Sequence, residues 1–217
     1  MYVGLKMLKD FPVFTPDTLI SEADKVMEEN KLWMVLVTKN EKLKGYVIKE
    51  DVRAALPSPL TTLSRYEINY LLNTLTIKDI IRTDMKTVYP DTEIEEAAYI
   101  MYKYNLPGLA VVNRKNKLVG YINRSVMLEV LVEEMGLEFG GSRIVIEVED
   151  RPGVIADIST LIANMKISII STATFFHNDK RMVVFRLNTE DPSPVVEKLK
   201  QKGYHLPTPD FFRSSWE

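Results

Sequence analysis

An internal repeat constrains the fold of this chain more than any other feature of its sequence. The segment 14–23, FTPDTLISEA, matches 88–97, VYPDTEIEEA, at an offset of 74 residues. The match resumes at 42–48, KLKGYVI, which aligns with 117–123, KLVGYIN, at an offset of 75. Two copies of this length are too few and too long for a solenoid. We therefore expect the copies to pack as a pseudo-symmetric pair.

Each copy predicts the same order of elements. A short apolar stretch ends at Pro-Asp-Thr, whose Asp and Thr side chains can accept hydrogen bonds from the free amides of a helix start. A helix with apolar residues at helical spacing follows. Two short strands come next, at 34–38 and 43–48 in the first copy and at 109–113 and 117–122 in the second, and then a second helix. Each copy is therefore predicted to be a βαββα unit.

Three further segments complete the predicted organisation. Ser64 and Glu67 have capping-box spacing, which indicates a linking helix between the copies. A glycine-rich sequence follows the second copy, and the residues after it predict βαββα with a possible last strand at 204–206, a ferredoxin-like order. The predicted divisions are a first repeat at 1–60, a linking helix at 61–75, a second repeat at 76–135, a glycine-rich linker at 136–142 and a C-terminal domain at 143–217.

Composition restricts the functions open to the chain. Lys and Arg number 28 against 30 for Asp and Glu, so no excess of positive charge is available to bind a nucleic-acid backbone. The absence of cysteine excludes disulfides, thiolate catalysis and Cys-ligated metals. The two histidines, His177 and His205, lie far apart, and no metal site is expected. No apolar run approaches the roughly 20 residues of a membrane helix, and Met1–Lys6 lacks the pattern of a signal peptide. We expect a cytoplasmic protein that is not an enzyme and requires no cofactor.

The repeated blocks resemble a known pair of domains. Pro-Asp-Thr-x-Ile-x-Glu-Ala, which occurs twice in closely similar form, and the two Gly-Tyr-hydrophobic strands are similar to a tandem pair of CBS domains. The segment 146–154, IEVEDRPGV, resembles the start of an ACT domain. With the linker sequences 57–63 and 67–72, the combination resembles the acetoin-utilisation protein B family. This resemblance implies an α+β fold in which a tandem CBS pair is followed by a ferredoxin-like ACT domain.

The resemblance also implies a regulatory function. CBS pairs generally bind adenosine compounds (AMP, ADP, ATP, S-adenosylmethionine or NAD) in clefts between their repeats. ACT domains generally bind amino acids or other small metabolites, and both modules usually assemble as symmetric pairs. We expect a homodimeric ligand sensor, with acetoin utilisation as its context and a protein target that the sequence does not name. The alternative expectation is a structural dimerisation or interaction module whose ligand sites have decayed.

The family motif for the adenosine site is Gly-h-h-Thr/Ser-x-x-Asp, in which the Asp accepts both ribose hydroxyls. An ionised carboxylate suits this role because it accepts several hydrogen bonds and donates none. The first repeat, GYVIKED at 45–51, has Asp51 at the ribose position but Ile48 at the hydroxyl position; the second, GYINRSV at 120–126, has Asn123 but ends in Val126. One competent cleft is therefore expected, around Asp51. By analogy, its other residues are Ile48 and Asn123, with Lys49, Arg82 and Arg124 as phosphate partners. The alternative is that Asp51 is only a first-turn acid favoured by the helix dipole.

In the C-terminal module the resemblance places an amino-acid site at the turn after the first strand. Gly153 permits close approach of the backbone, and the helix start that follows offers free amides to an anion. The expected residues are Asp150, Gly153, Val154 and Ile155. Alternatively, Gly153 only makes the tight turn while the sheet serves dimerisation.

Overall fold

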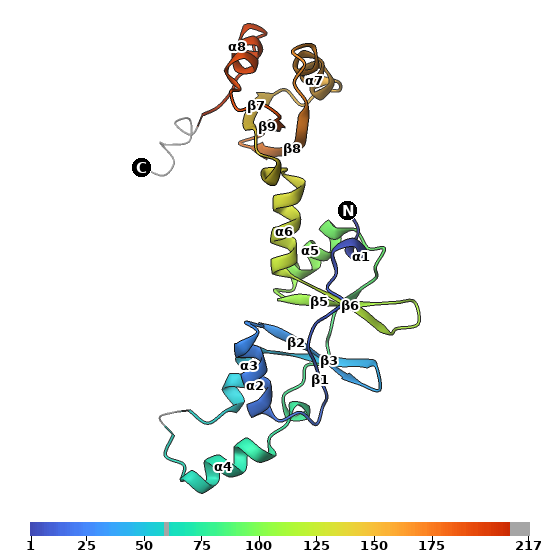
Figure 1. Ribbon diagram of the computed structural model, residues 1–217, viewed down its shortest axis with the longest axis vertical. Helices are drawn as coiled ribbons and strands as arrows, with labels where there is room; N and C mark the ends of the chain where they lie inside the picture. Colours follow the sequence, from blue (N-terminus) through green and yellow to red (C-terminus); the bar gives the residue numbers. More distant parts are fainter. Residues whose placement is uncertain (59–60, 209–217) are drawn as a thin grey trace. The chain divides into compact units, whose positions relative to one another are not determined.

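The computed structural model describes residues 1–58 and 61–208. Residues 59–60 of the predicted first repeat and 209–217 of the predicted C-terminal domain therefore lie outside the described residues. The chain divides into two compact units, residues 1–128 and 129–217, and each has its own strands and helices (Figure 1).

Unit 1 begins with the first repeat. Its elements are α1 (Val3–Lys6), β1 (Val13–Phe14), α2 (Ile20–Glu29), β2 (Met34–Lys39), β3 (Lys42–Ile48) and α3 (Lys49–Ala55). β1 pairs in parallel with β2, and β2 pairs antiparallel with β3. Apart from the short α1, the order is βαββα.

The second repeat follows a connecting helix and has the same topology. The elements are α4 (Arg65–Thr74), the 3-10 helix η1 (Ile77–Asp79), β4 (Thr87–Val88), α5 (Ile94–Lys103), β5 (Gly108–Val112), β6 (Leu118–Asn123) and α6 (Arg124–Glu134). The predicted capping box is present at α4, where Ser64 and Glu67 bond each other's backbone amides. The sheet order is β4-β5-β6, with one parallel and one antiparallel pair as in the first repeat.

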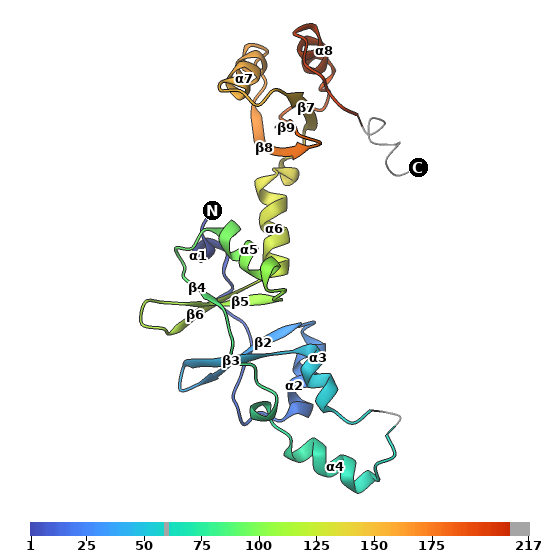
Figure 2. The ribbon, with the colours of Figure 1, turned by 180° about the vertical axis from the view of Figure 1, so that it is seen from behind.

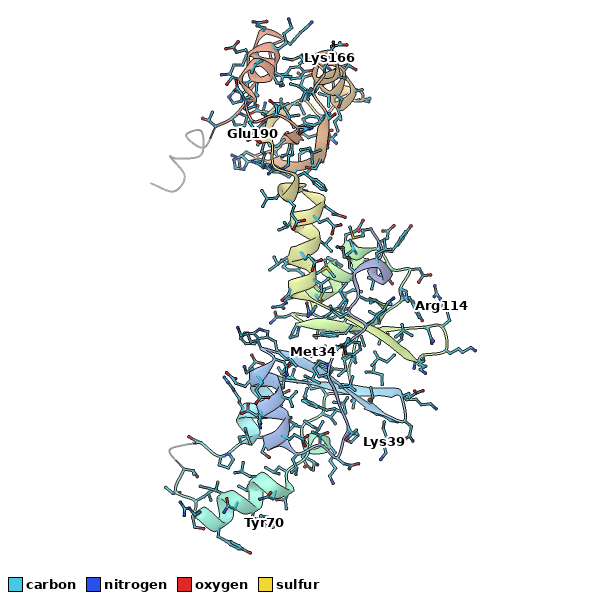
Figure 3. All side chains as sticks on the ribbon, viewed as in Figure 1. Met34, Lys39, Tyr70, Arg114, Lys166 and Glu190 are labelled. Atoms are coloured by element: carbon cyan, nitrogen blue, oxygen red, sulfur yellow. The ribbon has the colours of Figure 1, made fainter. Side chains whose placement is uncertain are left out.

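The central strands of unit 1, β2 and β5, are buried on both faces over most of their length. In β2, Met34 and Leu36 pack in a cluster with residues of the second repeat, whereas Val35 and Val37 pack on the first repeat's own helices. Figures 2 and 3 show the two sheets lying against each other, with Met34 between them. A strand buried on both sides reads as a continuous apolar run rather than an alternating one, which explains the sequence MVLV at 34–37.

Each repeat also contributes a short segment to the sheet of the other. Arg82, which precedes β4, forms an antiparallel bridge with Tyr46 of β3, and Leu8, which precedes β1, forms the equivalent bridge with Tyr121 of β6. Gly45 allows the first of these approaches, because a Cβ there would lie 2.1 Å from the carbonyl oxygen of Arg82. The exchanged segments place residues of both repeats at the edges of the inter-repeat clefts.

Unit 2 is a three-stranded antiparallel sheet with two helices. Its elements are β7 (Ser142–Val148), α7 (Val154–Asn164), β8 (Ile169–His177), β9 (Lys180–Leu187) and α8 (Ser193–Gln201), and the sheet order is β7-β9-β8. An isolated antiparallel bridge joins Glu147 of β7 to His205, and among the described residues the possible last strand at 204–206 is limited to this bridge. The α+β class, with two βαββα repeats and a ferredoxin-like C-terminal domain, is thereby confirmed.

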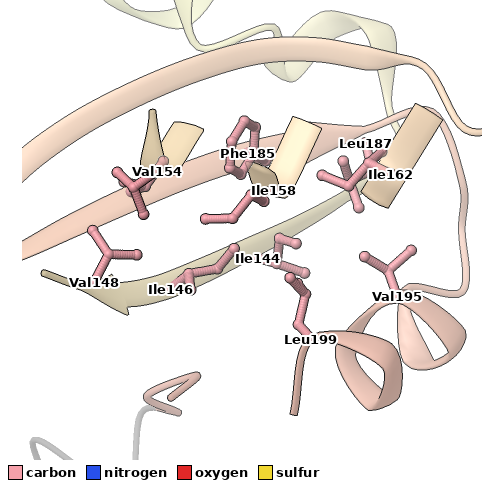
Figure 4. Close-up of a cluster of buried hydrophobic side chains, with 11 residues drawn as sticks. Ile144, Ile146, Val148, Val154, Ile158, Ile162, Phe185, Leu187, Val195 and Leu199 are labelled. Carbon is pink, nitrogen blue, oxygen red and sulfur yellow. The ribbon is translucent and has the colours of Figure 1, made fainter. Parts of the chain in front are cut away.

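The core of unit 2 lies between one face of this sheet and the two helices. Figure 4 shows side chains of β7, β9, α7 and α8 meeting there. The buried residues are Ile144, Ile146, Val148, Val154, Ile158, Ile162, Val183, Phe185, Leu187, Val195 and Leu199.

The segment expected to be a glycine-rich linker, 136–142, contains the 3-10 helix η2 (Leu137–Phe139) and is tied to the unit 2 sheet. Arg186 Nε donates to the carbonyl oxygen of Met135 at 3.0 Å, and its Nη1 donates to that of Gly140 at 3.1 Å. Ser171 Oγ also donates to Met135, at 2.8 Å. These bonds hold both ends of η2 against the strands.

Candidate functional site

A cavity of unit 1 lies between the two repeats and is called the first cleft below. Its volume is about 760 Å³, within the range of small-molecule sites, about 300–1,000 Å³. Tyr46 and Ile48 of β3 line it together with Arg82, Asp84 and Lys86 from the segment that leads into β4. The first cleft is therefore built by one repeat's strand and the other repeat's exchanged segment.

At the edge of the first cleft, Arg82 forms a two-pronged ion pair with Asp51 in the first turn of α3. Arg82 Nε donates to Asp51 Oδ2 at 2.6 Å, and Nη2 donates to Oδ1 at 2.8 Å. The carboxylate side chain is 24% exposed and the guanidinium side chain is 44% exposed. The hydrogen bonds that Arg82 donates to Asp51 raise the pKa of Arg82 above its usual value, so the guanidinium stays charged.

The structure brings four of the predicted residues to the first cleft. Ile48, Arg82, Asn123 and Arg124 all line it, and Asp51 adjoins it through Arg82. Arg124 is bonded within the protein: its Nε donates to the carbonyl oxygen of Leu106 at 3.0 Å and its Nη2 to Asn105 Oδ1 at 2.7 Å. Asn123 caps α6 by accepting from the amide of Val126 at 3.0 Å.

Lys49, predicted as a phosphate partner, stands apart from the cleft lining. Its ammonium is directed to α2, where it pairs with Glu28 Oε2 at 2.7 Å, and it lies 5.7 Å from the ring centroid of Trp33. The hydrogen bond from Lys49 lowers the pKa of Glu28. Lys49 thus has an acid partner in its own repeat.

Several lining residues were missed by the sequence reasoning, among them Trp33, Tyr46, Asp84 and Tyr104. Tyr46 donates its hydroxyl to Asp84 Oδ1 at 3.3 Å, and burial together with the charge of Asp84 raises the pKa of Tyr46. For Asp84 the repeat alignment contained a usable signal, because the offset of 74 sets it against Asp10, an acid in both copies.

The pseudo-symmetric position holds a smaller cavity of about 190 Å³, the second cleft, lined by Leu8, Asp10, Phe11 and Tyr121 among others. Phe11 packs on the ring of Tyr121 with the ring centroids 5.7 Å apart. Val126, at the position equivalent to Asp51, is 6% exposed. Neither an acid nor an arginine stands at the positions equivalent to Asp51 and Arg82.

In unit 2 the predicted site residues do not share one cavity wall. Asp150 accepts from Arg181 Nη1 at 2.5 Å. Gly153 has φ +85° at the N-terminus of α7, and a Cβ there would meet nothing within 4 Å. The side chain of Val154 is buried in the core and that of Ile155 packs at its edge. Of these four residues, only two could face a ligand at the turn: Asp150 offers a polar side chain, and the space around Gly153 is open.

Unit 2 carries a cavity of about 630 Å³ along α7 and α8, and its lining does not include Asp150 or Gly153. Lys198, Lys202 and Tyr204 line one side of it, and Asp157, Thr160 and Asn164 are among the α7 residues on the other. The predicted amino-acid site and this cavity are therefore different places in the domain.

The histidines lie on unit 2. His205 Nδ1 is 3.1 Å from Glu147 Oε2, and His177 Nε2 is 3.2 Å from the side-chain nitrogen of Asn178. Across residues 1–58 and 61–208 no cluster of three acidic or histidine side chains has the spacing of a metal site. Over the same residues no helix has the length and apolar character needed to cross a membrane.

Comparison with known families decides what the repeats are. A model of the CBS domain matches residues 3–58 and 77–133, more than half of the chain. The chain belongs to the CBS domain family. A model of the ACT domain matches residues 142–203. The interpretation of the repeated blocks as a CBS pair, and of 146–154 as the start of an ACT domain, is confirmed.

Curated relatives resemble the chain over part of its length. A CBS domain-containing protein of Dictyostelium discoideum is 29% identical over 136 residues, which cover 61% of this chain and 94% of that protein. A probable arabinose 5-phosphate isomerase of Haemophilus influenzae is 30% identical over 121 residues, which cover 55% of this chain. The matched region makes up only 33% of that isomerase.

Solved structures share the fold. A protein assigned to acetoin utilization (AcuB) from Vibrio cholerae superposes with a TM-score of 0.53 at 24% identity, covering 64% of this chain and 95% of that one. CBSX2 of Arabidopsis thaliana, determined in complex with AMP, gives a TM-score of 0.50 at 22% identity, covering 61% of this chain and 96% of that one. At these identities the likeness is one of fold.

Proposed function

We propose that this chain is a non-catalytic regulatory protein that binds an adenosine nucleotide in the first cleft. The observation that carries the proposal is the coincidence of a ligand-sized cavity, about 760 Å³, with a carboxylate and a guanidinium at its edge, contributed by different repeats. A carboxylate can accept the two hydroxyls of a ribose, and a guanidinium can bind a phosphate through two parallel hydrogen bonds.

The remaining lining supports a nucleotide rather than a sugar phosphate alone. Ile48, Leu106 and the aromatic side chain of Trp33 offer apolar surface for a base. Adenine is flat and mostly apolar at its faces, so burial against such side chains favours binding. Ile48 replaces the hydroxyl residue of the family motif, and the positively charged side chains of the lining that are available for phosphate are Lys31, Arg82, Lys86 and Arg124.

Two of the comparisons support a nucleotide ligand and a regulatory role. CBSX2, which shares the fold, was determined with AMP. Both modules that match the chain, CBS and ACT, are of regulatory type. AMP and ATP are the first ligands to test, followed by ADP, S-adenosylmethionine and NAD.

The ACT domain is part of the same proposal. It would transmit the ligand's effect, bind a small metabolite such as an amino acid at Asp150 and Gly153, or hold two chains together. Transmission requires the nucleotide to prefer one arrangement of the protein, by about 1–3 kcal/mol in typical allosteric systems. An Asp150→Ala variant that still shows amino-acid-induced changes in melting temperature would contradict the metabolite site.

Isothermal titration with AMP, ATP and S-adenosylmethionine tests the nucleotide site. We expect Asp51→Ala to weaken binding of the best ligand by about tenfold or more, because the ribose loses hydrogen bonds to a charged acceptor. Asp91→Ala is the matched control, since Asp91 is an exposed acid of the second repeat that pairs with Arg114. Equal affinity of the wild type and Asp51→Ala would contradict the assignment.

A second candidate function, a dimerisation module without a ligand, is favoured by one specific observation. Leu131 of α6 and Leu137 and Phe139 of η2 are exposed, and exposed apolar side chains near one another favour protein contacts. Light scattering of the wild type and Leu131→Glu, combined with thermal shifts in AMP, separates the two. A dimer lost in Leu131→Glu and no thermal shift in the wild type would support this alternative.

A role in acetoin utilisation is the context we propose for the protein. The fold likeness to the Vibrio cholerae protein, over 95% of that chain, supports it. Deleting the gene should impair growth on acetoin as carbon source, and restoring the wild-type gene should recover it. Unchanged growth of the deletion strain would contradict this context.

A further inference from the structure

The carboxylate that the proposed function assigns to ribose is already engaged. Both oxygens of Asp51 accept from Arg82, at 2.6 and 2.8 Å. In this two-pronged arrangement the guanidinium donates one hydrogen bond to each carboxylate oxygen, and so it covers the edge of the carboxylate at which both oxygens accept. The two vicinal hydroxyls of a ribose need the same edge, so the ribose and Arg82 cannot both bind Asp51 in this way.

Only the side chain of Arg82 is free to move. Its amide donates to the carbonyl oxygen of Tyr46 at 2.9 Å, and its carbonyl accepts from the amide of Tyr46 at 3.0 Å. Gly45 brings the two segments into close contact at this point. A guanidinium released from Asp51 therefore stays at the first cleft, where it needs another anion.

The acid and the arginine also occur as a unit. The two residues come from different repeats. Local effects such as helix formation or turn geometry therefore do not explain why they occur together. In the second cleft, Leu8 stands where Arg82 would be and Val126 where Asp51 would be. At the larger cleft both members are present, Arg82 in the lining and Asp51 bonded to it, and at the smaller cleft both are absent.

We infer that Asp51 and Arg82 form an exchange pair that restricts the first cleft to adenosine compounds carrying a phosphate. On binding, the ribose hydroxyls take the place of Arg82 on Asp51, and the phosphate takes the place of Asp51 on Arg82. This inference rests on the proposed function and names the ligand class of the same site.

The energetic reason is the balance of charge. With a phosphorylated ligand, the guanidinium exchanges one charge-assisted pair for another. With unphosphorylated adenosine, the guanidinium, whose side chain is 44% exposed, loses both charge-assisted hydrogen bonds to Asp51 and gains no phosphate in exchange. We expect this to weaken adenosine relative to AMP by about 10- to 100-fold, the range for loss of a charged hydrogen-bond partner.

The test is titration of AMP and of adenosine into the full chain, comparing the wild type with Arg82→Gln. The wild type should bind AMP at least about tenfold more tightly than adenosine. Arg82→Gln should weaken AMP and strengthen adenosine, because Asp51 no longer has to be released, so the ratio falls toward one. Arg114→Gln is the matched control: it removes a surface arginine from an ion pair with Asp91 outside the cleft lining and should leave both affinities unchanged.

The outcomes separate the inference from the function beneath it. If AMP binds the wild type but Arg82→Gln weakens AMP and adenosine by the same factor, the exchange is wrong and the nucleotide site stands. The same conclusion follows if the wild type binds AMP and adenosine with equal affinity. In that case Asp84, the other acid near Tyr46, would pair with the released guanidinium in place of Asp51. If neither ligand binds the wild type, both proposals fail. If Arg82→Gln melts far below the wild type, Arg82→Lys is used in its place. Lysine keeps the charge but cannot form two parallel hydrogen bonds, so this variant must also lower the ratio of AMP to adenosine affinity.

Discussion

The two inter-repeat clefts differ although the repeats that build them share a topology and matching backbone bridges. The first has a volume of about 760 Å³ and the second about 190 Å³. Phe11 fills part of the second by packing on Tyr121, and the residue at the equivalent position of the other repeat is Met85. The duplicated backbone provides two candidate sites, and a handful of side chains decides which remains open and charged. Four predictions test this comparison.

The largest effect is expected from Gly45→Ala. A Cβ at this position would lie 2.1 Å from the backbone oxygen of Arg82, so the exchanged segment must move and its bridge to β3 must break. We expect a loss of about 3 kcal/mol in the free energy of unfolding, at the upper end for overpacking, measured by urea denaturation. Gly120→Ala is the matched variant in the other repeat.

At Gly120 the nearest atom to an added Cβ is the sulfur of Met7, at 2.5 Å. A methionine side chain can rotate away, so Gly120→Ala should cost only about 1 kcal/mol. An equal loss in the free energy of unfolding for Gly45→Ala and Gly120→Ala would show that the two exchanged segments tolerate an added Cβ equally well. The packing of these segments would then not distinguish the two clefts.

The second prediction installs the missing pair in the second cleft. Val126→Asp should destabilise the protein by about 2 kcal/mol, because it places an unpaired carboxylate at a site that is 6% exposed. Leu8→Arg alone should have little effect, since Leu8 is 37% exposed. The double variant should recover about 1 kcal/mol of the loss.

Strict additivity of the two changes would mean that positions 8 and 126 do not face each other as Arg82 and Asp51 do. Titration of the double variant should still show one AMP per chain. The second cleft, at about 190 Å³, is smaller than ligand sites usually are, and adding charges does not enlarge it.

The third prediction uses the tyrosines of the two clefts. Burial raises the pKa of Tyr121, and burial with the charge of Asp84 raises that of Tyr46. Both groups therefore favour folding fully below their unfolded pKa near 10, and this contribution is lost as pH rises through their folded pKa values. The loss for each is at most about 1.4 kcal/mol per pH unit above 10.

Urea denaturation at pH 8 and pH 10.5 measures this difference. Tyr121→Phe should lose less stability than the wild type between these pH values, and Tyr46→Phe should show the same change to a smaller extent. Identical pH dependence in all three proteins would contradict the inferred burial of the hydroxyls.

The smallest effect is expected at the surface of the second repeat. Arg114 pairs with Asp91 at 2.6 Å and lies over the ring of Tyr89, 4.1 Å from its centroid, but the paired side chains are mostly exposed. Arg114→Gln should change the free energy of unfolding by no more than about 0.5 kcal/mol. A loss above 1 kcal/mol would mean that surface ion pairs, and not the clefts alone, distinguish the repeats.

Much of the architecture was predictable because it follows from local patterns. The repeated Pro-Asp-Thr blocks and the strand–strand pattern after them predicted both βαββα units, and the Ser64–Glu67 spacing predicted the cap of α4. The 136–142 segment was harder. Its glycines predicted a linker, whereas the bonds from Arg186 to residues 135 and 140 come from a strand some 50 residues away.

The site was predictable in kind but not in arrangement. Asp51, Ile48 and Arg82 were identified by motif and analogy, and the structure brings Ile48 and Arg82 to one cavity. Lys49 was placed beside phosphate by analogy with the family site. Successive residues in the first turn of a helix project in different directions, and its ammonium is directed to Glu28.

By itself, the sequence determined that the chain contains two copies of one unit and a third module, because hydrophobic period, capping residues and turn residues act over a few neighbouring positions. Only the tertiary structure decided that Arg82 of one repeat bonds Asp51 of the other and that the two clefts differ in size. Those outcomes depend on an exchange of segments between distant parts of the chain, and on whether a side chain such as Phe11 fills the space that the exchange leaves.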